Sequence, residues 1–457
     1  MRRHTAFRIG SHICLVLMLA CLVASGFIIQ PAQAEEMKNE LQQLIDQAQQ
    51  DTILKVPAGE YSGPILITKP IHVEAEGTVT VRSQGDAPVV TLKSNQASLR
   101  GLTLLDERQG AETATLVVEG SRNVLKELTI ETKGTGLQLR KGEHNQIIGN
   151  KIKGLLAGKA IPTGLNETRS PGKKGNGIDL KEANNNTIMG NLVENMFDGI
   201  YVETSHYNRV EKNMVYDSRY GYHLMFSNDV TLIHNQGDRN VTGGMVMGSD
   251  NAVVTDNRFT KQNESVNSQG ILLFDVQKAR VERNYVEGNR VGLYVEAAEK
   301  NEISYNQILQ NYIGLQLKES KDNSFTGNHF IGNVTQAEAQ SSTDNLLQLN
   351  YWDSAQSVDL QGDGKSDLSY RINPFFFALT DQVEAFQIFF QSPGLLFLES
   401  MFDDHSGAFL QDPQPLMAPI EQQNQAPTTH SPIIIVISAI MLAGSIYFIY
   451  LMGVRTK

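Results

Sequence analysis

Cysteine is almost absent from this chain of 457 residues. Its two cysteines, Cys14 and Cys21, both lie inside an N-terminal segment with the composition of a signal peptide. The rest of the chain offers no thiol, which excludes disulfide bonds and thiolate metal ligands there. Basic residues are also few, because 39 Lys and Arg face 50 Asp and Glu, for a formal net charge of −11. This acidic balance argues against nucleic acid as a partner and is compatible with cations.

The N-terminal segment predicts export. Residues 1–34 combine several arginines, an apolar run and the small-residue motif Ala32-Gln33-Ala34, which is typical of a secretory signal peptide that is cut after Ala34. A lipobox-like motif that ends at Cys21 leaves lipidation as an alternative to simple cleavage.

An apolar segment near the other end of the sequence predicts membrane attachment. Residues 433–454 hold no charged side chain and are long enough to cross a bilayer as a helix. Arg455 and Lys457 follow this segment, which places its C-terminal end in the cytoplasm by the positive-inside tendency. Residues 411–432 are rich in Pro and Gln and would tether an extracytoplasmic body to the membrane.

A repeat of 22 residues organises the centre of the chain. A glycine followed by an alternating apolar run recurs at Gly177, Gly199, Gly221, Gly243, Gly270, Gly292 and Gly314. An asparagine series has the same steps: Asn191, Asn213, Asn235, Asn257, Asn284, Asn306 and Asn328. Both series contain one step of 27 residues at the same place, which predicts a loop after Asn257. A second, longer insertion is expected around residues 155–174.

Short strands broken by Gly and Asn at this period predict an all-β fold, a single-stranded parallel β-helix over residues 52–345. Each strand would pair with those of the neighbouring coils, about 4.8 Å away. We expect the asparagines to be structural, because Asn tolerates left-handed turns and its amide can bond the Asn of the next coil. Residues 35–51 have the apolar spacing of a helix that would cap the first coil.

Alternation within the repeats predicts which side chains point away from the core. Tyr222 and Leu224 should lie inside, and the residues that alternate with them should point outward. Over two successive repeats, the outward residues are His223, Met225, Met245 and Met247, which we name the His/Met patch. Imidazole and thioether groups without thiolates favour Cu(I). The alternative is an apolar strip that merely packs against another segment or a partner.

The sequence DLQGDGKSD, residues 359–367, has the spacing of an EF-hand loop. Its candidate calcium ligands are Asp359, Gln361, Asp363 and Asp367. Gln at the third position and Tyr370 in place of the closing Glu depart from that motif. The alternative is a polar turn held by bonds from Asp side chains to the backbone.

Residues 372–410 are aromatic but too polar to cross a membrane. They would either cap the last coil or dock on a partner at the membrane surface.

Several stretches together resemble the NosD family of extracytoplasmic maturation proteins for nitrous oxide reductase. They include VPAGEYSGPILITKPI, GNGIDLKEANNNTIMGN, GYHLMFSNDV and the segment NYWDSAQSVDLQGDGKSDLSYR, and they span most of residues 52–400. The resemblance implies a right-handed β-helix and copper binding. We expect no enzymatic activity, because the centre of the outer face is apolar and rich in sulfur. It also implies partners, namely the permease and ATPase subunits of an ABC transporter, nitrous oxide reductase and a copper chaperone. The membrane segment at residues 433–454 departs from many relatives.

Two other functions are compatible with the sequence. One is a carbohydrate-active lyase or epimerase, for which Asp179, Lys181 and Glu203 would supply acids and a base on the outer face. The other is a metal-free structural adaptor of the transporter. For the assembly protein itself, the material handled could be copper or sulfur.

Overall fold

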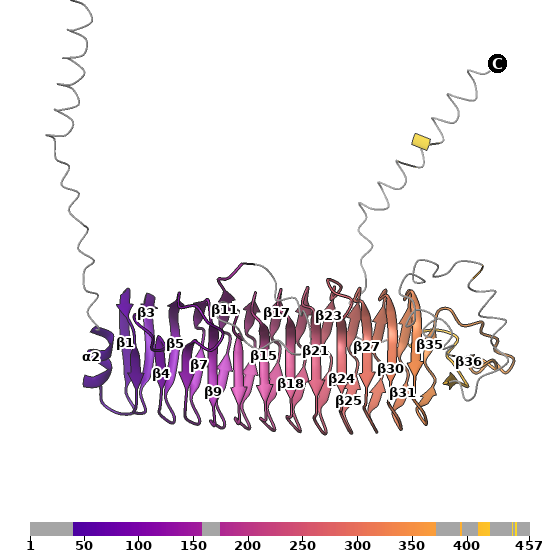
Figure 1. The fold of residues 1–457 in the computed structure, drawn as a ribbon, viewed down its shortest axis with the longest axis horizontal. Helices are drawn as coiled ribbons and strands as arrows, with labels where there is room; N and C mark the ends of the chain where they lie inside the picture. The colour runs from indigo at the N-terminus through magenta and orange to yellow at the C-terminus, as the bar shows by residue number, and fades with distance from the viewer. Residues whose placement is uncertain are drawn as a thin grey trace, which may run out of the picture.

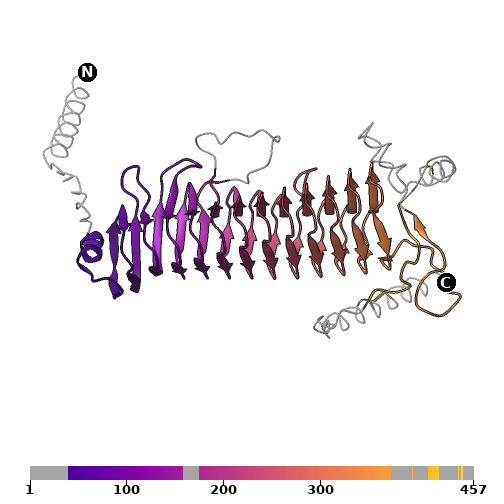
Figure 2. The same ribbon diagram turned by 90° about the horizontal axis from the view of Figure 1, so that it is seen from below.

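Stacked coils form an elongated rod with a short helix at one end (Figure 1; the view from below is Figure 2). The computed structural model describes residues 40–157, 174–371 and 410–420, together with residues 394, 441, 444 and 445. The expected signal peptide and nearly all of the expected membrane segment lie outside these residues. So do most of the expected linker, most of the insertion expected around residues 155–174 and nearly all of the aromatic segment of residues 372–410. Within the described residues, no helix has the length and apolar character needed to cross a membrane.

One side of the rod is a parallel sheet of 12 strands, which we call sheet B. Its strands, one per coil, are β2 (Ile65–Ile67), β4 (Val90–Leu92), β6 (Ala114–Val118), β9 (Thr135–Arg140), β12 (Ile178–Lys181), β15 (Asp198–Glu203), β18 (Tyr220–Met225), β21 (Thr242–Met247), β24 (Gln269–Phe274), β27 (Val291–Glu296), β30 (Ile313–Lys318) and β33 (Thr335–Gln340).

The remaining sides form a parallel sheet of 23 strands, sheet A. It begins with the long strands β1 (Ile53–Ser62), β3 (His72–Arg82) and β5 (Ser98–Asp106). It then divides into two columns. The first column is β7 (Val124–Lys126), β10 (Gln146–Ile148), β13 (Thr187–Met189), β16 (Arg209–Glu211), β19 (Thr231–Ile233), β22 (Val253–Thr255), β25 (Arg280–Glu282), β28 (Glu302–Ser304), β31 (Ser324–Thr326) and β34 (Leu346–Gln348). The second column is β8 (Thr129–Thr132), β11 (Lys151–Gly154), β14 (Leu192–Glu194), β17 (Met214–Tyr216), β20 (Gln236–Asp238), β23 (Arg258–Thr260), β26 (Tyr285–Glu287), β29 (Gln307–Leu309), β32 (His329–Ile331) and β35 (Tyr351–Trp352).

The predicted all-β parallel solenoid is therefore confirmed, with about 13 turns. The step of 27 residues holds a loop between β23 and β24, as its extra residues predict.

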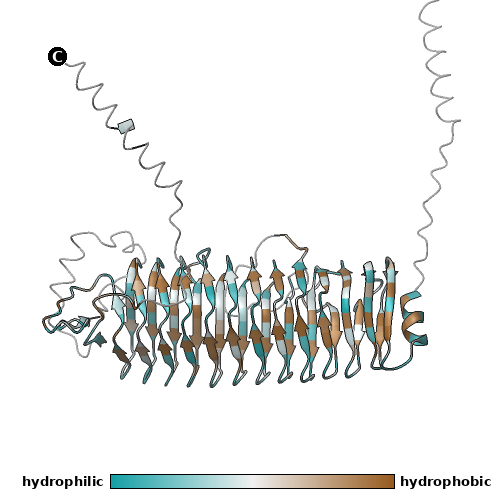
Figure 3. Cartoon of the chain, turned by 180° about the vertical axis from the view of Figure 1, so that it is seen from behind, coloured by the Kyte–Doolittle hydropathy of each residue, from teal (hydrophilic) through white to brown (hydrophobic). Residues whose placement is uncertain are grey.

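Inward-facing aliphatic and aromatic side chains from all three columns of strands make one continuous core. Hydrophobic and hydrophilic residues alternate along the chain within the coils (Figure 3). The last coil, β34 and β35, extends the solenoid to Trp352, somewhat beyond residue 345.

The asparagine series forms a buried ladder between the two columns of sheet A. Asn213, for example, donates its backbone N–H and its side-chain Nδ2–H to Oδ1 of Asn235, at 2.9 and 3.0 Å. The same Nδ2 group also donates to the carbonyl oxygen of Ile188 at 2.9 Å. The pattern repeats from Asn150 to Asn350, and it confirms the predicted structural role. Buried amides that satisfy one another in this way avoid the cost of unpaired polar groups.

The prediction that the repeating asparagines occupy left-handed turns was wrong. The ladder asparagines do not adopt positive φ. The left-handed positions, with φ from 52° to 67°, are the residues just before them: Gly190, Lys212, His234, Asp256, Arg283, Tyr305, Gly327 and Leu349. A left-handed non-Gly residue costs about 1–2 kcal/mol. Because Lys, His and Leu all occupy this position, the ladder and the stacking of coils set the turn, rather than the local preference of the residue.

Helix α2 (Glu40–Gln47) covers the first coil, as the apolar spacing predicts. Leu41 and Ile45 are buried against the core, while Leu44 stays exposed. The side chain of Gln42 accepts from the N–H of Leu66 at 2.7 Å and donates to its carbonyl oxygen at 3.0 Å. The helix thus occupies the first edge of sheet B, which would otherwise offer unpaired backbone groups.

A segment distant in sequence closes the other end of the ladder. β37 (Gln411–Asp412) pairs antiparallel with β36 (Tyr370–Arg371), and Asp412 is completely buried. Oδ2 of Asp412 accepts from the backbone and side-chain nitrogens of Asn350 at 2.9 and 3.0 Å, and from Nε1 of Trp352 at 3.2 Å. The carboxylate therefore takes the place that the next asparagine would hold.

Replacing Asp412 tests this closure. Asp412→Ala leaves three buried donors without an acceptor and should cost on the order of 3 kcal/mol of stability. Asp412→Asn keeps an acceptor for the ladder and should cost less. Hydrogen exchange at the amides of β32, β34 and β35 measures the effect, with Glu302→Ala at an exposed position of β28 as the control. Unchanged protection of β35 in Asp412→Ala would show that the carboxylate does not stabilise the last coil.

Candidate functional site

The His/Met patch lies on two adjacent strands of sheet B. His223 pairs in register with Met245, and Met225 with Met247, across β18 and β21. Adjacent strands are about 4.8 Å apart, and alternate residues of one strand about 6.6 Å. The structure therefore brings the four residues together as the repeat predicts.

These side chains lie on the outer face of the sheet, although they are largely covered. Leu224 and Val246, which alternate with them, belong to the core, as does Tyr222. His223 and Met245 lie outside that core and expose only 7% and 8% of their surface. Met225 and Met247 are partly exposed. The patch therefore combines a covered imidazole with thioethers that are partly accessible to solvent.

The two ring nitrogens of His223 differ in their hydrogen bonding. Its Nδ1 lies 2.9 Å from Oδ2 of Asp198. Its Nε2 is buried and has no hydrogen-bond partner among the residues that the structure describes. The rings of Tyr201 and Tyr220 flank the imidazole, each with its centroid 4.9 Å away. A buried nitrogen without a partner is costly, and it is the kind of group that a ligand or a metal ion would satisfy.

Asp198 is held by a second partner, Arg219. The guanidinium makes a bidentate pair with the carboxylate, with two N–O distances of 2.8 Å. It is stacked between the rings of Phe197 and Tyr220, 3.6 and 4.2 Å from their centroids. Burial alone would raise the pKa of Asp198, but the charge of Arg219 and the hydrogen bond from His223 outweigh it and hold the pKa well below its ordinary value. The carboxylate is therefore ionised and can only accept, so Nδ1 of His223 carries the proton.

The sequence interpretation missed Asp198, Arg219 and Tyr220. It counted outward residues only after the repeating glycine, whereas Asp198 and Tyr220 stand just before it. They are in register across β15 and β18. The same 22-residue step would have aligned these two positions, but it gives no sign that Asp198 reaches diagonally to His223 on the next coil.

The acids considered for an enzyme are engaged in ion pairs. Asp179, which is buried, lies 2.6 Å from Nη1 of Arg140 and accepts from Nδ2 of Asn176 at 2.8 Å. Glu203 lies 3.1 Å from Nζ of Lys181. Carboxylates paired in this way are less available as a general acid or base than free ones.

In the loop of residues 359–367, the carboxylates turn toward the backbone of the loop itself. Asp359 accepts from the N–H groups of Gly362 at 2.6 Å and Gly364 at 2.9 Å, and these bonds lower its pKa, that from Gly364 most. Asp367 accepts from the N–H of Leu360 at 2.7 Å and from Nε2 of Gln361 at 3.1 Å. This is the geometry expected of a polar turn, and calcium binding by Asp359, Gln361, Asp363 and Asp367 stays a prediction. In the part of the chain that the structure describes, no three or more His, Cys, Asp or Glu side chains are grouped to hold a metal ion.

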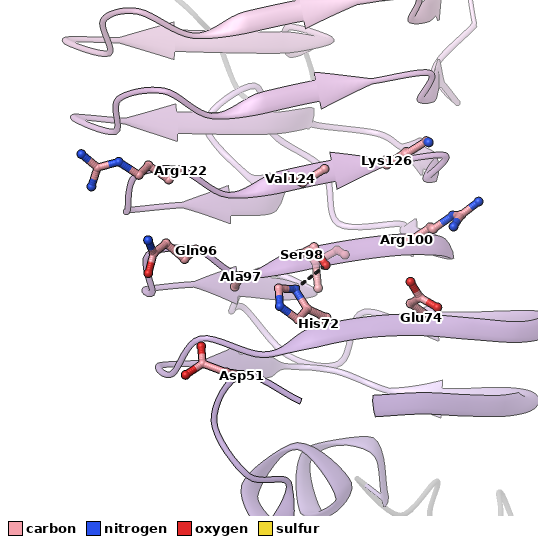
Figure 4. Close-up of a pocket in the computed structure, with 11 residues that line it drawn as sticks. Asp51, His72, Glu74, Gln96, Ala97, Ser98, Arg100, Arg122, Val124 and Lys126 are labelled. Atoms are coloured by element: carbon pink, nitrogen blue, oxygen red, sulfur yellow. Dashed lines mark hydrogen bonds between the residues drawn. The ribbon is translucent and has the colours of Figure 1, made fainter. Parts of the chain in front are cut away.

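A hollow of about 530 Å³ lies elsewhere, on sheet A near the first coils (Figure 4). Charged side chains from successive coils line it, among them Glu74, Arg100 and Lys126. Arg100 is already paired with Glu127 at 2.9 Å, and His72 bonds Ser98 through Nδ1 at 2.9 Å. No buried polar group without a partner lines this hollow among the described residues. The outer face of sheet B is the better candidate site.

These features define the class of protein: a parallel β-solenoid that presents imidazole and thioether groups on one sheet. Solved structures of similar fold include an alginate lyase in complex with G6, with 13% identity, 69% of this chain and 83% of that chain covered, and a TM-score of 0.52. They also include the A-module of an Azotobacter vinelandii mannuronan C-5 epimerase, with 16% identity, 68% and 87% covered, and a TM-score of 0.45. Similarity at this level concerns the fold alone. No curated protein sequence matches the chain at a significant level.

Residues 159–362 match the family described as periplasmic copper-binding protein (NosD). This match and the solenoid together fit a NosD-type periplasmic β-helix protein. The resemblance inferred from the sequence is thereby confirmed. The matched range contains all four residues of the His/Met patch.

Glu338 is a further buried acid on the same face. It lies in β33 and continues the column that contains His223 and Met245, in register with Gln316. Only 4% of its surface is exposed. Burial raises its pKa to about 7, against a smaller opposing influence of the charge of Arg290.

This pKa predicts a dependence of stability on pH. The folded protein holds the proton of Glu338 more tightly than the unfolded chain, whose carboxyl has a pKa near 4.5. The stabilisation is fully present below that value and is lost as pH rises to about 7, by roughly 2–3 kcal/mol. Glu338→Gln should abolish this part of the profile, as measured by thermal unfolding between pH 4.5 and 7.5. Glu302→Gln at an exposed position should leave it intact, and a Glu338→Gln profile identical to the parent's would contradict the assignment.

Proposed function

We propose that this protein binds Cu(I) through the His/Met patch and serves outside the cytoplasm in assembling the copper centres of nitrous oxide reductase. The observation that carries the proposal concerns Nε2 of His223. This nitrogen is buried, has no partner within the described part of the chain, and belongs to a residue in register with Met245. Met225 and Met247 supply two more soft donors on the same two strands. Bound there, Cu(I) would be held by uncharged ligands that favour the monovalent ion.

The residues of the patch fit a copper ion on two counts. The donor set contains an imidazole and thioethers, which suit Cu(I) better than Zn(II) or Ca(II). The other ring nitrogen donates its Nδ1–H to the carboxylate of Asp198, the arrangement found behind most metal-binding histidines. The description of the matched family names copper, which is independent support.

The wider role rests on the family resemblance and on the expected ends of the chain. An export signal at residues 1–34 agrees with a periplasmic family description. A membrane helix at residues 433–454 would hold the solenoid close to the permease and ATPase subunits of an ABC transporter. From there the protein would receive copper from a chaperone and pass it toward nitrous oxide reductase.

A metal-free adaptor is the second candidate. Met225, Met247 and Phe274 form a partly exposed strip on adjacent strands, and such a strip could contact a protein partner without any ion.

Cu(I) titration of the full-length chain against a chromophoric chelator tests the proposal. We expect one bound Cu(I) per chain, with nitrogen and sulfur ligands in its X-ray absorption spectrum. His223→Ala and the triple variant Met225/Met245/Met247→Ala should each weaken binding by about tenfold or more. Met214→Ala, on sheet A, is the matched control and should bind as the parent does.

Other outcomes would favour the alternatives. Unchanged stoichiometry and affinity in the triple variant would favour the metal-free adaptor. Release of unsaturated uronides from alginate by the purified protein would support a lyase.

A further inference from the structure

The two carboxylates that adjoin the His/Met patch are both neutralised by cations. Asp198 lies beside His223 and is paired with Arg219 at 2.8 Å. Glu203 is in register with Met225 and is paired with Lys181 at 3.1 Å. The first pair is buried, since the side chain of Asp198 is 2% exposed and that of Arg219 17%. The second pair is more open to solvent.

The pairing of these carboxylates affects which ions the His/Met patch can bind, because it removes negative charge from the site. The desolvation cost of an ion grows with the square of its charge, so a divalent ion in a covered site needs anionic ligands. A soft monovalent ion such as Cu(I) has a smaller desolvation cost, so uncharged nitrogen and sulfur ligands are enough to bind it. A site made of thioethers, an imidazole and a closed ion pair therefore offers no negative charge to the ion, which disfavours Zn(II) and Cu(II).

We propose, building on the copper site above, that Arg219 determines the selectivity of the patch for monovalent copper by withholding the Asp198 carboxylate from the ion. Asp198 in turn positions His223: it accepts from Nδ1–H and so leaves the lone pair of Nε2 for the metal. Arg219 itself is kept in place by the rings of Phe197 and Tyr220. Neither Asp198 nor Arg219 contacts the ion in this arrangement.

The chain contains a matched control for this pair. Arg140 and Asp179 form a similar ion pair, at 2.6 Å, with a buried carboxylate on the same face of sheet B. Asp179 stands in the column of His223 but two strands away, next to Tyr201. Its carboxylate is therefore too distant to ligate an ion in the patch.

The first measurement needs no metal. The ¹⁵N spectrum of histidine-labelled full-length protein should show His223 with Nδ1 protonated and Nε2 unprotonated. In Asp198→Asn, the amide NH₂ can donate to Nδ1 and drive the proton to Nε2. The tautomer should therefore invert, and Cu(I) affinity should fall by about 10–100-fold. Arg140→Gln should leave both the tautomer and the affinity unchanged.

The second measurement is selectivity, from parallel titrations with Cu(I) and Zn(II). Arg219→Gln frees the carboxylate and should raise Zn(II) affinity by about tenfold or more, with a much smaller effect on Cu(I). Arg219→Lys, which keeps the charge, should restore most of the discrimination against Zn(II). Arg140→Gln should discriminate as the parent does. Equal Zn(II) affinity in Arg219→Gln and in the parent would overturn the proposal.

A double variant keeps the test decisive if Arg219→Gln does not fold. Asp198→Asn/Arg219→Gln replaces the ion pair by an uncharged one. This variant should still reject Zn(II), but it should lose the parent tautomer of His223 and bind Cu(I) more weakly. A double variant that kept both the parent tautomer and the parent Cu(I) affinity would overturn the proposal. Failure of the parent protein to bind Cu(I) would refute the proposed function instead. Copper binding with nitrogen and sulfur ligands, combined with unaltered selectivity in the Arg219 variants, would refute only the inference about Arg219.

Discussion

The stacking of coils in register, with a buried asparagine bonded to the next at each step, is the constraint on which the rest of the structure depends. The strands of each coil pair in parallel with those of the neighbouring coils, and the amides of the ladder bond one another between the two columns of sheet A. The ladder tolerates left-handed Lys, His and Leu beside it. Because such a ladder always leaves a last member unsatisfied, the chain returns 62 residues later to place Asp412 against Asn350.

The same regularity turns a one-dimensional repeat into a surface. Any residue type that recurs at one position of the repeat becomes a column on the outside of the rod. On sheet B the column of His223 has a polar, ion-paired end at Asp179, a soft centre at Met245 and a second acid at Glu338. A site there requires no cleft in the backbone, since side chains of neighbouring coils already lie about 4.8 Å apart. The parts of the outer face of sheet B differ in which of their charged side chains form ion pairs.

The fold alone says little about activity. An alginate lyase shares the solenoid with this chain at 13% sequence identity, and a fold of this kind carries many functions. The carboxylates that could suggest such an enzyme here are held by Arg140 and Lys181. Among the buried side-chain atoms that lack a partner within the described residues, Nε2 of His223 is the one that belongs to a strong metal-ligating group. Function is therefore better inferred from the donor set and its charge balance than from the solenoid.

The amino-acid sequence by itself determined the period, the coil architecture, the loop after Asn257, the helix that covers the first coil and the outward direction of His223 and its methionine neighbours. These features follow from local alternation and from repetition, both of which are visible in one dimension. Only the tertiary structure decided that Asp198 and Arg219 lie behind His223 and that Asp412 ends the ladder. Those contacts cross from one coil to another along a diagonal, or join segments far apart, and no periodic pattern encodes them. The turn residues show the same limit, since their left-handed φ comes from the coils above and below rather than from their own preferences.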